Sequence, residues 1–305
     1  MHDKQGDLIH VAGNAVLDLL VRGVDSAAGQ DVAAWSRGSV QFLDNPVAPA
    51  LGGTAATAYL LGRLGAPVSL NTQIGDDALG AVIRQWLADA GVALVSPVAA
   101  STATNLILVA ADGTPHWHYH TGQKIDWHRS ASVTGATWFY ASGYGQADRE
   151  DLAQLREVFA TVRSRGVRVA FDPGPWLFAR TNQEEMEQAW AQVDCLIGTE
   201  AELSTWHADD CLEELVARLL ACGPHCVVVK RGSDGAVYGG ANGKVEECPA
   251  EPVEKANTVG AGDTFNARLL HGLARGEPLG TTIAEAVRLA TAAVKRGKGV
   301  LGALG

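Results

Sequence analysis

The sequence predicts a layered α/β protein whose central sheet is mostly parallel and covered by helices on both faces. Apolar residues make up 47% of the 305 residues and charged residues only 19%, fewer than the roughly 25% of an average globular chain. This composition indicates that many segments of the chain are interior, with other segments packed against both of their faces. After residue 138, apolar strand-like runs alternate with helical patterns, the order that produces parallel strands joined by helices.

The first half of the chain contains two kinds of segment. We expect strands at 8–12, 16–21 and 68–73 and helices at 54–64 and 78–90, each helix closed by a glycine. Residues 104–120 predict two strands that turn at Asp112-Gly113. Because no linker or repeat is visible, we expect one domain, residues 1–305, in which segments near 14–50 and 100–122 form a small β appendage.

The second half of the chain is more regular. We expect strands at 138–142, 167–172, 195–197 and 226–230 and helices at 148–165, 182–192, 200–206 and 211–222. Open parallel sheets bind ligands at the carboxyl ends of their strands. The functional residues are therefore expected at that edge.

Charge and cysteine content exclude several classes of protein. The net charge is −10 and basic residues form no long cluster, which argues against a general nucleic-acid or anionic-membrane surface. The five cysteines show no C-x-x-C spacing, as expected for reduced thiols. No uninterrupted apolar run of about 18 residues is present. We expect a cytoplasmic protein with neither nucleic acid nor membrane as a partner.

The segment 257–267 carries the clearest chemical signal. Gly260 and Gly262 precede an amphipathic stretch, so the N–H groups of Gly260, Ala261 and Gly262 are predicted to face one point at a helix N-terminus, where an anion is stabilised. Asp263 at the edge of this site would repel a phosphate and instead suits a base that takes the proton of an attacking hydroxyl. A helix cap is the structural alternative for Asp263.

Four motifs stand in the order and spacing of the ribokinase-like (pfkB-type) carbohydrate kinases, which this sequence resembles from Gly13 to about Gly299. They are 257–267, the Gly52-Gly53 helix ending at Arg63-Leu64-Gly65, the turn Gly75-Asp76-Asp77-x-x-Gly80, and 230–235. The resemblance implies a three-layer α/β/α sandwich with a mostly parallel central sheet and a small β-sheet lid. It also implies an ATP-dependent phosphotransferase that phosphorylates a hydroxyl of a small sugar or sugar derivative, with ATP and Mg²⁺ as cofactors. A homodimer through the lid is left open.

The resemblance implies catalytic and substrate-binding roles for several residues. Asp263 matches the family's catalytic base, and residues 260–262 match the anion hole for the transferred phosphoryl group. Asp18 matches the acid that binds substrate hydroxyls, which suits a carboxylate because it accepts several O–H groups. Gly52 and Gly53 match the glycine pair that faces the substrate, where a missing side chain permits close approach.

The resemblance also implies residues for the nucleotide and the metal. Gly232, Ser233 and Gly235 match the nucleotide loop, and Lys230 stands where it could reach a phosphate. Glu202 matches the acid near Mg²⁺ and is expected to act through metal-bound waters.

Three positions depart from the family pattern. An asparagine of the helix after Gly53 is missing, Thr199 replaces the asparagine three residues before Glu202, and Asn257 replaces a commoner aspartate. The first two departures keep a non-catalytic ligand sensor open as an alternative function. The third leaves activation by a monovalent cation open.

A run of alternating histidines adds a further question. His116, His118 and His120 alternate with Trp117 and Tyr119, so the three histidines share one face of the predicted strand. A metal site would need a further ligand that the sequence does not supply. We expect a lid strand whose aromatic or imidazole face touches the substrate, with plain packing as the alternative. Because such aromatic residues can also stack on a base, a nucleoside kinase is a second candidate.

Overall fold

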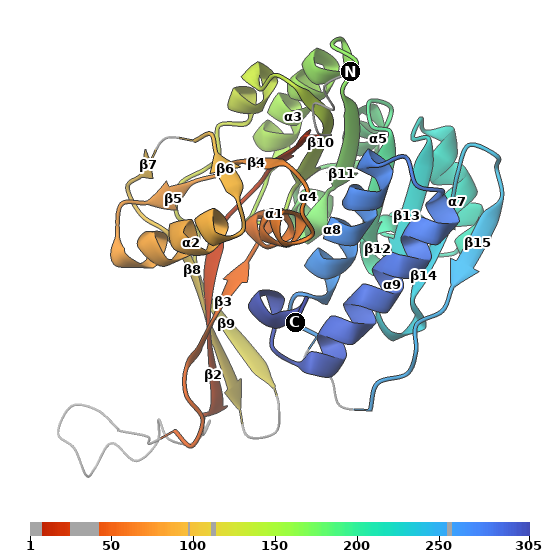
Figure 1. The fold of residues 1–305 in the computed structure, drawn as a ribbon. Helices are drawn as coiled ribbons and strands as arrows, with labels where there is room; N and C mark the ends of the chain where they lie inside the picture. Colours follow the sequence, from red (N-terminus) through yellow and green to blue (C-terminus); the bar gives the residue numbers. More distant parts are fainter. Residues whose placement is uncertain (1–7, 25–42, 97, 111–113, 255–257) are drawn as a thin grey trace, which may run out of the picture.

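A nine-stranded sheet forms the centre of the molecule (Figure 1). The computed structural model describes residues 8–24, 43–96, 98–110, 114–254 and 258–305. Part of the expected lid segment, the turn at Asp112-Gly113 and Asn257 lie outside the described residues. The strand order is β15 (Val245–Cys248), β14 (Ala236–Gly239), β13 (Cys226–Lys230), β12 (Cys195–Thr199), β11 (Arg168–Asp172), β10 (Ala136–Ser142), β1 (Leu8–Ala12), β4 (Val68–Asn71) and β6 (Val92–Leu94).

Neighbouring strands from β6 to β13 run parallel, and only the pairs β13–β14 and β14–β15 are antiparallel. The parallel strands are buried on both faces because their side chains alternate between two separate cores. In β10, Trp138 and Tyr140 pack into one core, whereas Phe139 and Ala141 pack into the other.

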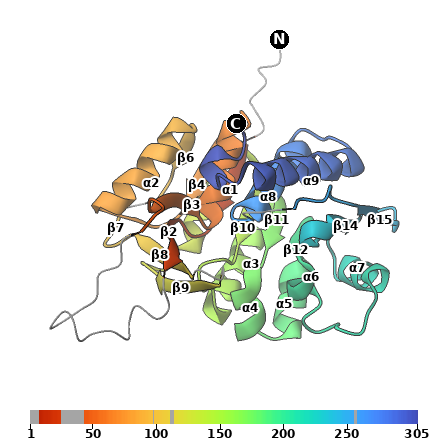
Figure 2. The same cartoon turned by 90° about the horizontal axis from the view of Figure 1, so that it is seen from below.

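Helices cover both faces of this sheet (Figure 2). One core contains residues of α1 (Thr54–Arg63), α2 (Ala78–Asp89), α8 (Ala261–Ala274) and α9 (Leu279–Arg296). The other core contains residues of α3 (Arg149–Arg163), α4 (Gly174–Arg180), α5 (Gln183–Trp190), α6 (Glu200–Leu203) and α7 (Leu212–Ala221). No helix in the described part of the chain is long and apolar enough to cross a membrane.

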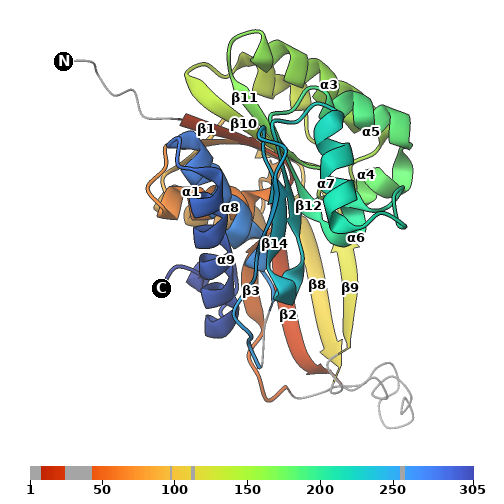
Figure 3. The same ribbon diagram turned by 90° about the vertical axis from the view of Figure 1, so that its right-hand side faces the viewer.

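A small separate sheet projects from the main one (Figure 3). Its order is β3 (Ala48–Gly52), β2 (Val16–Val24), β8 (Ala103–Ala110) and β9 (Pro115–His120), with β2 and β8 parallel and the other pairs antiparallel. Two short strands, β5 (Ile74–Gly75) and β7 (Val98–Ala99), pair nearby. The fold class predicted from the sequence, three layers with a small separate sheet, is confirmed.

Some element predictions differ from the structure. No helix was predicted between the strand 167–172 and the helix 182–192, but α4 begins at Gly174 with Pro175 in its first turn, where proline fits a helix. No element was predicted for β14 and β15, which are only four residues long each, or for α9. The helix expected at 200–206 is only four residues long.

Candidate active site

Two cavities lie on either side of the start of α8, where several central strands end. The first, here called the Asp263 cavity, has a volume of about 230 Å³, and the second, the Gly232 cavity, of about 200 Å³. Gly260 and Gly262 line the Asp263 cavity, whereas Ala261 lines the Gly232 cavity. The N-terminus of α8 therefore separates the two.

The start of α8 is set by Gly260. This residue has φ 83° and precedes the first helical residue, Ala261. A Cβ atom on Gly260 would lie 2.6 Å from a methyl carbon of Val300, so both conformation and space require glycine there. The N–H of Ala261 donates to the Thr258 carbonyl, and within the described residues the N–H of Gly262 has no acceptor. The helix N-terminus thus presents positive potential at the boundary between the cavities.

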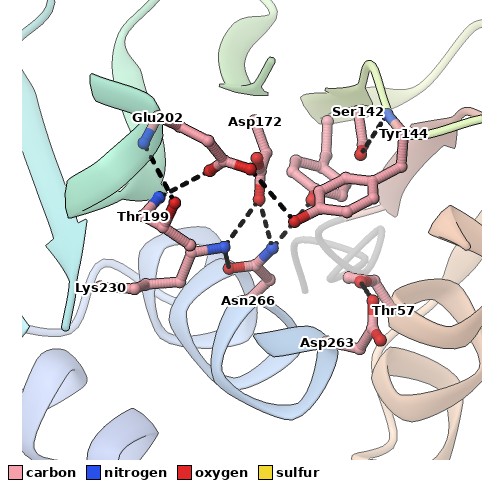
Figure 4. Close-up of polar contacts among 10 residues, drawn as sticks. Thr57, Ser142, Tyr144, Asp172, Thr199, Glu202, Lys230, Asp263 and Asn266 are labelled. Carbon is pink, nitrogen blue, oxygen red and sulfur yellow. Dashed lines mark hydrogen bonds and ion pairs between the residues drawn. The ribbon is translucent and has the colours of Figure 1, made fainter. Parts of the chain in front are cut away.

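Asp263 lies in the first turn of α8 and lines the Asp263 cavity. Its Oδ1 accepts a hydrogen bond of 3.1 Å from the Thr57 hydroxyl of α1 (Figure 4). Burial raises the pKa of Asp263 to about 6, against the opposing effects of the Thr57 hydrogen bond and of Lys230. A carboxylate with such a pKa is suited to accept a proton near neutral pH.

A buried network around Lys230 forms another part of the lining of the Asp263 cavity. The Lys230 ammonium lies 2.8 Å from Asp172 Oδ2 and donates to Asn266 Oδ1 at 3.3 Å. The Asn266 amide donates to the same Asp172 oxygen at 2.9 Å and to the Tyr140 hydroxyl at 3.0 Å. Burial alone would lower the pKa of Lys230, but the carboxylates of Asp172, Glu202 and Asp263 together outweigh it and raise the pKa above its ordinary value. Lys230 is therefore charged at neutral pH.

Glu202 lies next to this network and is held at the start of α6. The N–H of Thr199 donates to Glu202 Oε2 at 2.8 Å, and the N–H of Glu202 donates to the Thr199 hydroxyl at 3.3 Å. Thr199, which departs from the family pattern, thus serves as a helix cap. Burial, and then the Asp172 charge, raise the pKa of Glu202. Its Oε1 accepts a hydrogen bond of 3.3 Å from the Tyr144 hydroxyl (Figure 4).

Asp18 approaches from the small sheet. It lies on β2, lines the Asp263 cavity and accepts a 3.0 Å hydrogen bond from the Asn105 amide of β8. Burial raises the pKa of Asp18 to about 6, and the Asn105 hydrogen bond opposes this shift. A Cβ atom on Gly52 would lie only 2.3 Å from Asp18 Oδ2, so the glycine leaves room for this carboxylate. Gly53 lines the same cavity.

The two faces of β9 have different surroundings. Asn105 lies opposite both Asp18 and Tyr119 in the sheet register, so Tyr119 shares the face of Asp18. The three alternating histidines lie on the other face. Among the described residues, no three His, Cys, Asp or Glu side chains gather as a metal site would require. The aromatic face of β9, rather than the imidazole face, is the one directed to the Asp263 cavity.

Most of the site residues predicted from the sequence line one of the two cavities, and one lies beside them. Around the Asp263 cavity it brings together Asp18, Gly52, Gly53, Lys230, Gly260, Gly262 and Asp263. Around the Gly232 cavity it brings together Gly232, Ser233, Gly235 and Ala261. Glu202 lies beside the first group, bonded to Tyr144. Lys230, predicted with the nucleotide loop, lines the Asp263 cavity instead.

Sequence reasoning missed several polar residues of the site. Asp172 was predicted only as the last residue of the strand 167–172, and Asn266, Thr57 and Tyr144 were not assigned a role. A usable signal existed for Asp172, because an acid that directly ends a buried strand must lie at the ligand-binding edge of a parallel sheet. Thr57 and Asn266 come from helices, where the sequence does not show which strand or helix they face.

Comparisons with known proteins identify the family of this chain. Residues 15–302 match the family described as pfkB family carbohydrate kinase. A fructokinase of Klebsiella pneumoniae is 26% identical over 235 residues, 73% of this chain and 76% of the relative. A nucleoside kinase of Methanothermobacter thermautotrophicus is 28% identical over 245 residues, 75% of this chain and 74% of the relative.

Solved structures show the same fold. An E. coli protein assigned as a ribokinase II, in complex with ATP and Mg²⁺, superposes with a TM-score of 0.75 at 19% identity, covering 97% of both chains. This likeness concerns the fold, whereas the family match covers nearly the whole sequence. The chain belongs to the pfkB family of carbohydrate kinases.

Proposed function

We propose that this protein transfers the γ-phosphoryl group of ATP to a hydroxyl of a small, uncharged sugar or sugar derivative. The observation that carries the proposal is the position of Asp263. Its buried carboxylate, with a pKa raised to about 6, lies at the helix N-terminus that separates the two cavities. A base beside an anion-stabilising helix end is the arrangement that phosphoryl transfer to a hydroxyl requires.

The Asp263 cavity supplies groups for the acceptor. Asp18 accepts hydrogen bonds that hydroxyls of the acceptor substrate donate. The missing side chains of Gly52 and Gly53 let this substrate approach the backbone. Asp263 takes the proton of the attacking hydroxyl. Lys230 and the N–H groups at the start of α8 neutralise charge that develops on the phosphoryl oxygens. The small sheet, as a lid over this cavity, excludes water that would otherwise compete with the acceptor.

The Gly232 cavity suits the adenine of ATP. Apolar side chains, including Phe265, Val287 and Val294, form much of its wall, and Gly232 and Gly235 lie at its edge. Glu202 would hold Mg²⁺ through the metal's waters, because each of its oxygens already accepts one protein hydrogen bond and has a further lone pair. When bound, Mg²⁺ would neutralise charge on the ATP phosphates.

Charge in the Asp263 cavity favours an uncharged acceptor. Among the described residues, the lining includes three carboxylates, Asp18, Asp172 and Asp263, and one cation, Lys230. Lys230 is already paired with Asp172. An acceptor that carries a phosphate or carboxylate would face a net negative surface, and such like-charge contacts are unfavourable.

A screen for ADP release tests the proposed function. Wild-type protein with ATP and Mg²⁺ should release ADP in the presence of one or more neutral pentoses, hexoses or nucleosides and not with sugar acids or sugar phosphates. Binding of a sugar without any ADP release would instead support the non-catalytic sensor. Turnover restricted to anionic acceptors would contradict the proposed charge selectivity.

Acid pH is expected to inactivate the enzyme. Asp263 must be ionised to accept a proton, so with a pKa of about 6 it is competent above this pH and loses its function as the pH falls through it. Asp18 has a pKa of about 6 as well and loses its charge in the same range. Initial rates from about pH 5 to about pH 8 should give kcat/KM values that decline below about pH 6. A flat profile down to about pH 5 would contradict this role of Asp263.

Replacing Asp18 with alanine is expected to raise the acceptor KM by about tenfold, because hydrogen bonds to a charged group contribute about 1.5–3 kcal/mol. The KM for ATP should stay unchanged, since Asp18 does not line the Gly232 cavity. Asp76→Ala is a matched control, because the Asp76 side chain is 90% exposed. Steady-state kinetics with both substrates measure the two constants, and an unaltered acceptor KM would assign Asp18 a structural role.

Other features remain predictions. They are a single domain that includes the lid segments, a homodimer through the lid, cytoplasmic location and activation by a monovalent cation. Light scattering of the purified protein tests the dimer, and rates in K⁺ against rates in tetramethylammonium test the cation.

A further inference from the structure

Thr57 places a hydroxyl in a part of α1 that is otherwise apolar. Its side chain is 1% exposed, and the neighbouring Ala55, Ala56 and Ala58 are fully buried. A buried hydroxyl is costly unless it is hydrogen-bonded, and threonine favours a helix less than alanine does. A threonine at this position therefore needs a reason that lies outside its own helix.

The hydrogen-bond partner of Thr57 lies on another helix. Its hydroxyl donates to Asp263 Oδ1 of α8 at 3.1 Å (Figure 4). A threonine inside a helix commonly donates instead to the carbonyl four residues earlier, which here belongs to Gly53. In the described part of the chain the Thr57 hydroxyl donates to Asp263 alone. The hydroxyl thus holds the proposed base rather than the backbone of its own helix.

Thr57 reaches the site only through Asp263. The lining of the Asp263 cavity includes Asp263 itself, Gly53 and Thr54, but not Thr57. Oδ1 of Asp263 accepts the hydrogen bond from Thr57, and within the described residues Oδ2 accepts none. The second oxygen of this carboxylate is therefore available to a hydroxyl of the acceptor.

Several groups act on the pKa of Asp263. Burial raises it most, and the hydrogen bond from Thr57 is the largest effect that lowers it, ahead of the Lys230 charge. The titratable groups that face Asp263 come from neighbouring strands and from the segment after β10: Asp18, Asp172, Lys230, Tyr140 and Tyr144. The two other carboxylates raise the pKa of Asp263, and both tyrosines have raised pKa values of their own and stay neutral. The Thr57 hydrogen bond therefore helps to keep Asp263 ionised near neutral pH.

We propose that Thr57 is a positioning residue for the phosphoryl transfer, whose hydroxyl fixes Oδ1 of Asp263 and leaves Oδ2 to take the proton of the attacking hydroxyl. The inference rests on the proposed function, in which Asp263 is the base. The carboxylate cannot rotate away from the acceptor without breaking the bond to Thr57, so the accepting oxygen stays in place. Loss of the hydroxyl should therefore change both the rate and its pH dependence.

Thr57→Val removes the hydroxyl and keeps the shape of the side chain. Without this donor the pKa of Asp263 rises, so the acid limb of kcat/KM should move from about pH 6 to about pH 7. At about pH 9, where Asp263 is ionised in both proteins, kcat should stay about tenfold lower, because the carboxylate is no longer fixed. The acceptor KM should change by less than about twofold, since Thr57 does not line the cavity. Thr57→Ser keeps the hydroxyl and should restore the wild-type acid limb.

Thr282→Val is the matched control. Thr282 is also fully buried in a helix, α9, and its hydroxyl has no hydrogen-bond partner in the part of the chain that the structure describes. Its pH profile should superpose on that of the wild type. An unshifted acid limb in Thr57→Val, or equal shifts in Thr57→Val and Thr57→Ser, would overturn the role of Thr57 and leave the proposed kinase function intact. No turnover of any acceptor by the wild type would overturn both.

Carbon NMR of the aspartate carboxyl groups gives a readout that does not need activity. The Asp263 signal is identified by its loss in Asp263→Asn. In Thr57→Val this signal should titrate about one pH unit higher than in the wild type and in Thr57→Ser. An unchanged titration would overturn the proposal even if Thr57→Val is inactive at every pH.

Discussion

Asp263→Asn is expected to lower kcat by about 10²–10⁴-fold, the range that a general base contributes. Asparagine has the shape of aspartate and its carbonyl can still accept the hydrogen bond from Thr57. Affinity for ATP should therefore remain unchanged. Because burial raises the pKa of Asp263, the ionised carboxylate opposes folding at neutral pH, and the variant should be at least as stable as the wild type.

Steady-state kinetics and thermal melting together check this variant. Asp77→Asn serves as a comparison, since Asp77 caps α2 through the N–H of Gly80 and should affect stability more than catalysis. Activity of Asp263→Asn within about tenfold of the wild type would remove Asp263 from the role of base.

Lys230→Met is expected to destabilise the protein by about 3–5 kcal/mol, the usual effect of removing one partner of a buried ion pair. The Lys230 and Asp172 side chains are only 11% and 1% exposed. Without the ammonium, Asp172 keeps the Asn266 hydrogen bond but lies uncompensated near Glu202 and Asp263. Catalysis should fall as well, because Lys230 is the cation that lines the Asp263 cavity in the described part of the chain.

Urea denaturation measures the loss of stability. The double variant Lys230→Met/Asp172→Asn should recover about half of it or more, because the stranded charge is removed together with its partner. Lys295→Met is the exposed control. Its side chain is 48% exposed in the pair with Glu251, so the change should stay below about 1 kcal/mol. A loss below about 1 kcal/mol for Lys230→Met would contradict the proposed network.

The layered fold could be predicted because its evidence is local and repeated. Alternating buried strands and helices, with closing glycines such as Gly65 and Gly91, give the parallel sheet directly. The short strands β14 and β15 gave no comparable pattern, because four residues carry little periodicity. Similarly, α4 was hidden by two prolines, which mark turns more often than helix starts.

The site could be predicted only where a motif ties residues together in the sequence. Asp263 and the glycines before it follow one another, so their joint function was visible. The partners Thr57 and Asp263 are 206 residues apart, and the order of residues does not show that α1 packs against α8. Lys230 was assigned to the nucleotide loop because it precedes Gly232, yet its side chain points to Asp172 across the sheet.

Transfer of labelled phosphate tests the central claim most directly. The protein should be incubated with ATP labelled in the γ-phosphoryl group, Mg²⁺ and the acceptor that gives the highest ADP release, and the products separated. We predict that wild type transfers the label to a hydroxyl of the acceptor and that Asp263→Asn transfers almost none. Label that appears as inorganic phosphate, or equal transfer by wild type and Asp263→Asn, would contradict it.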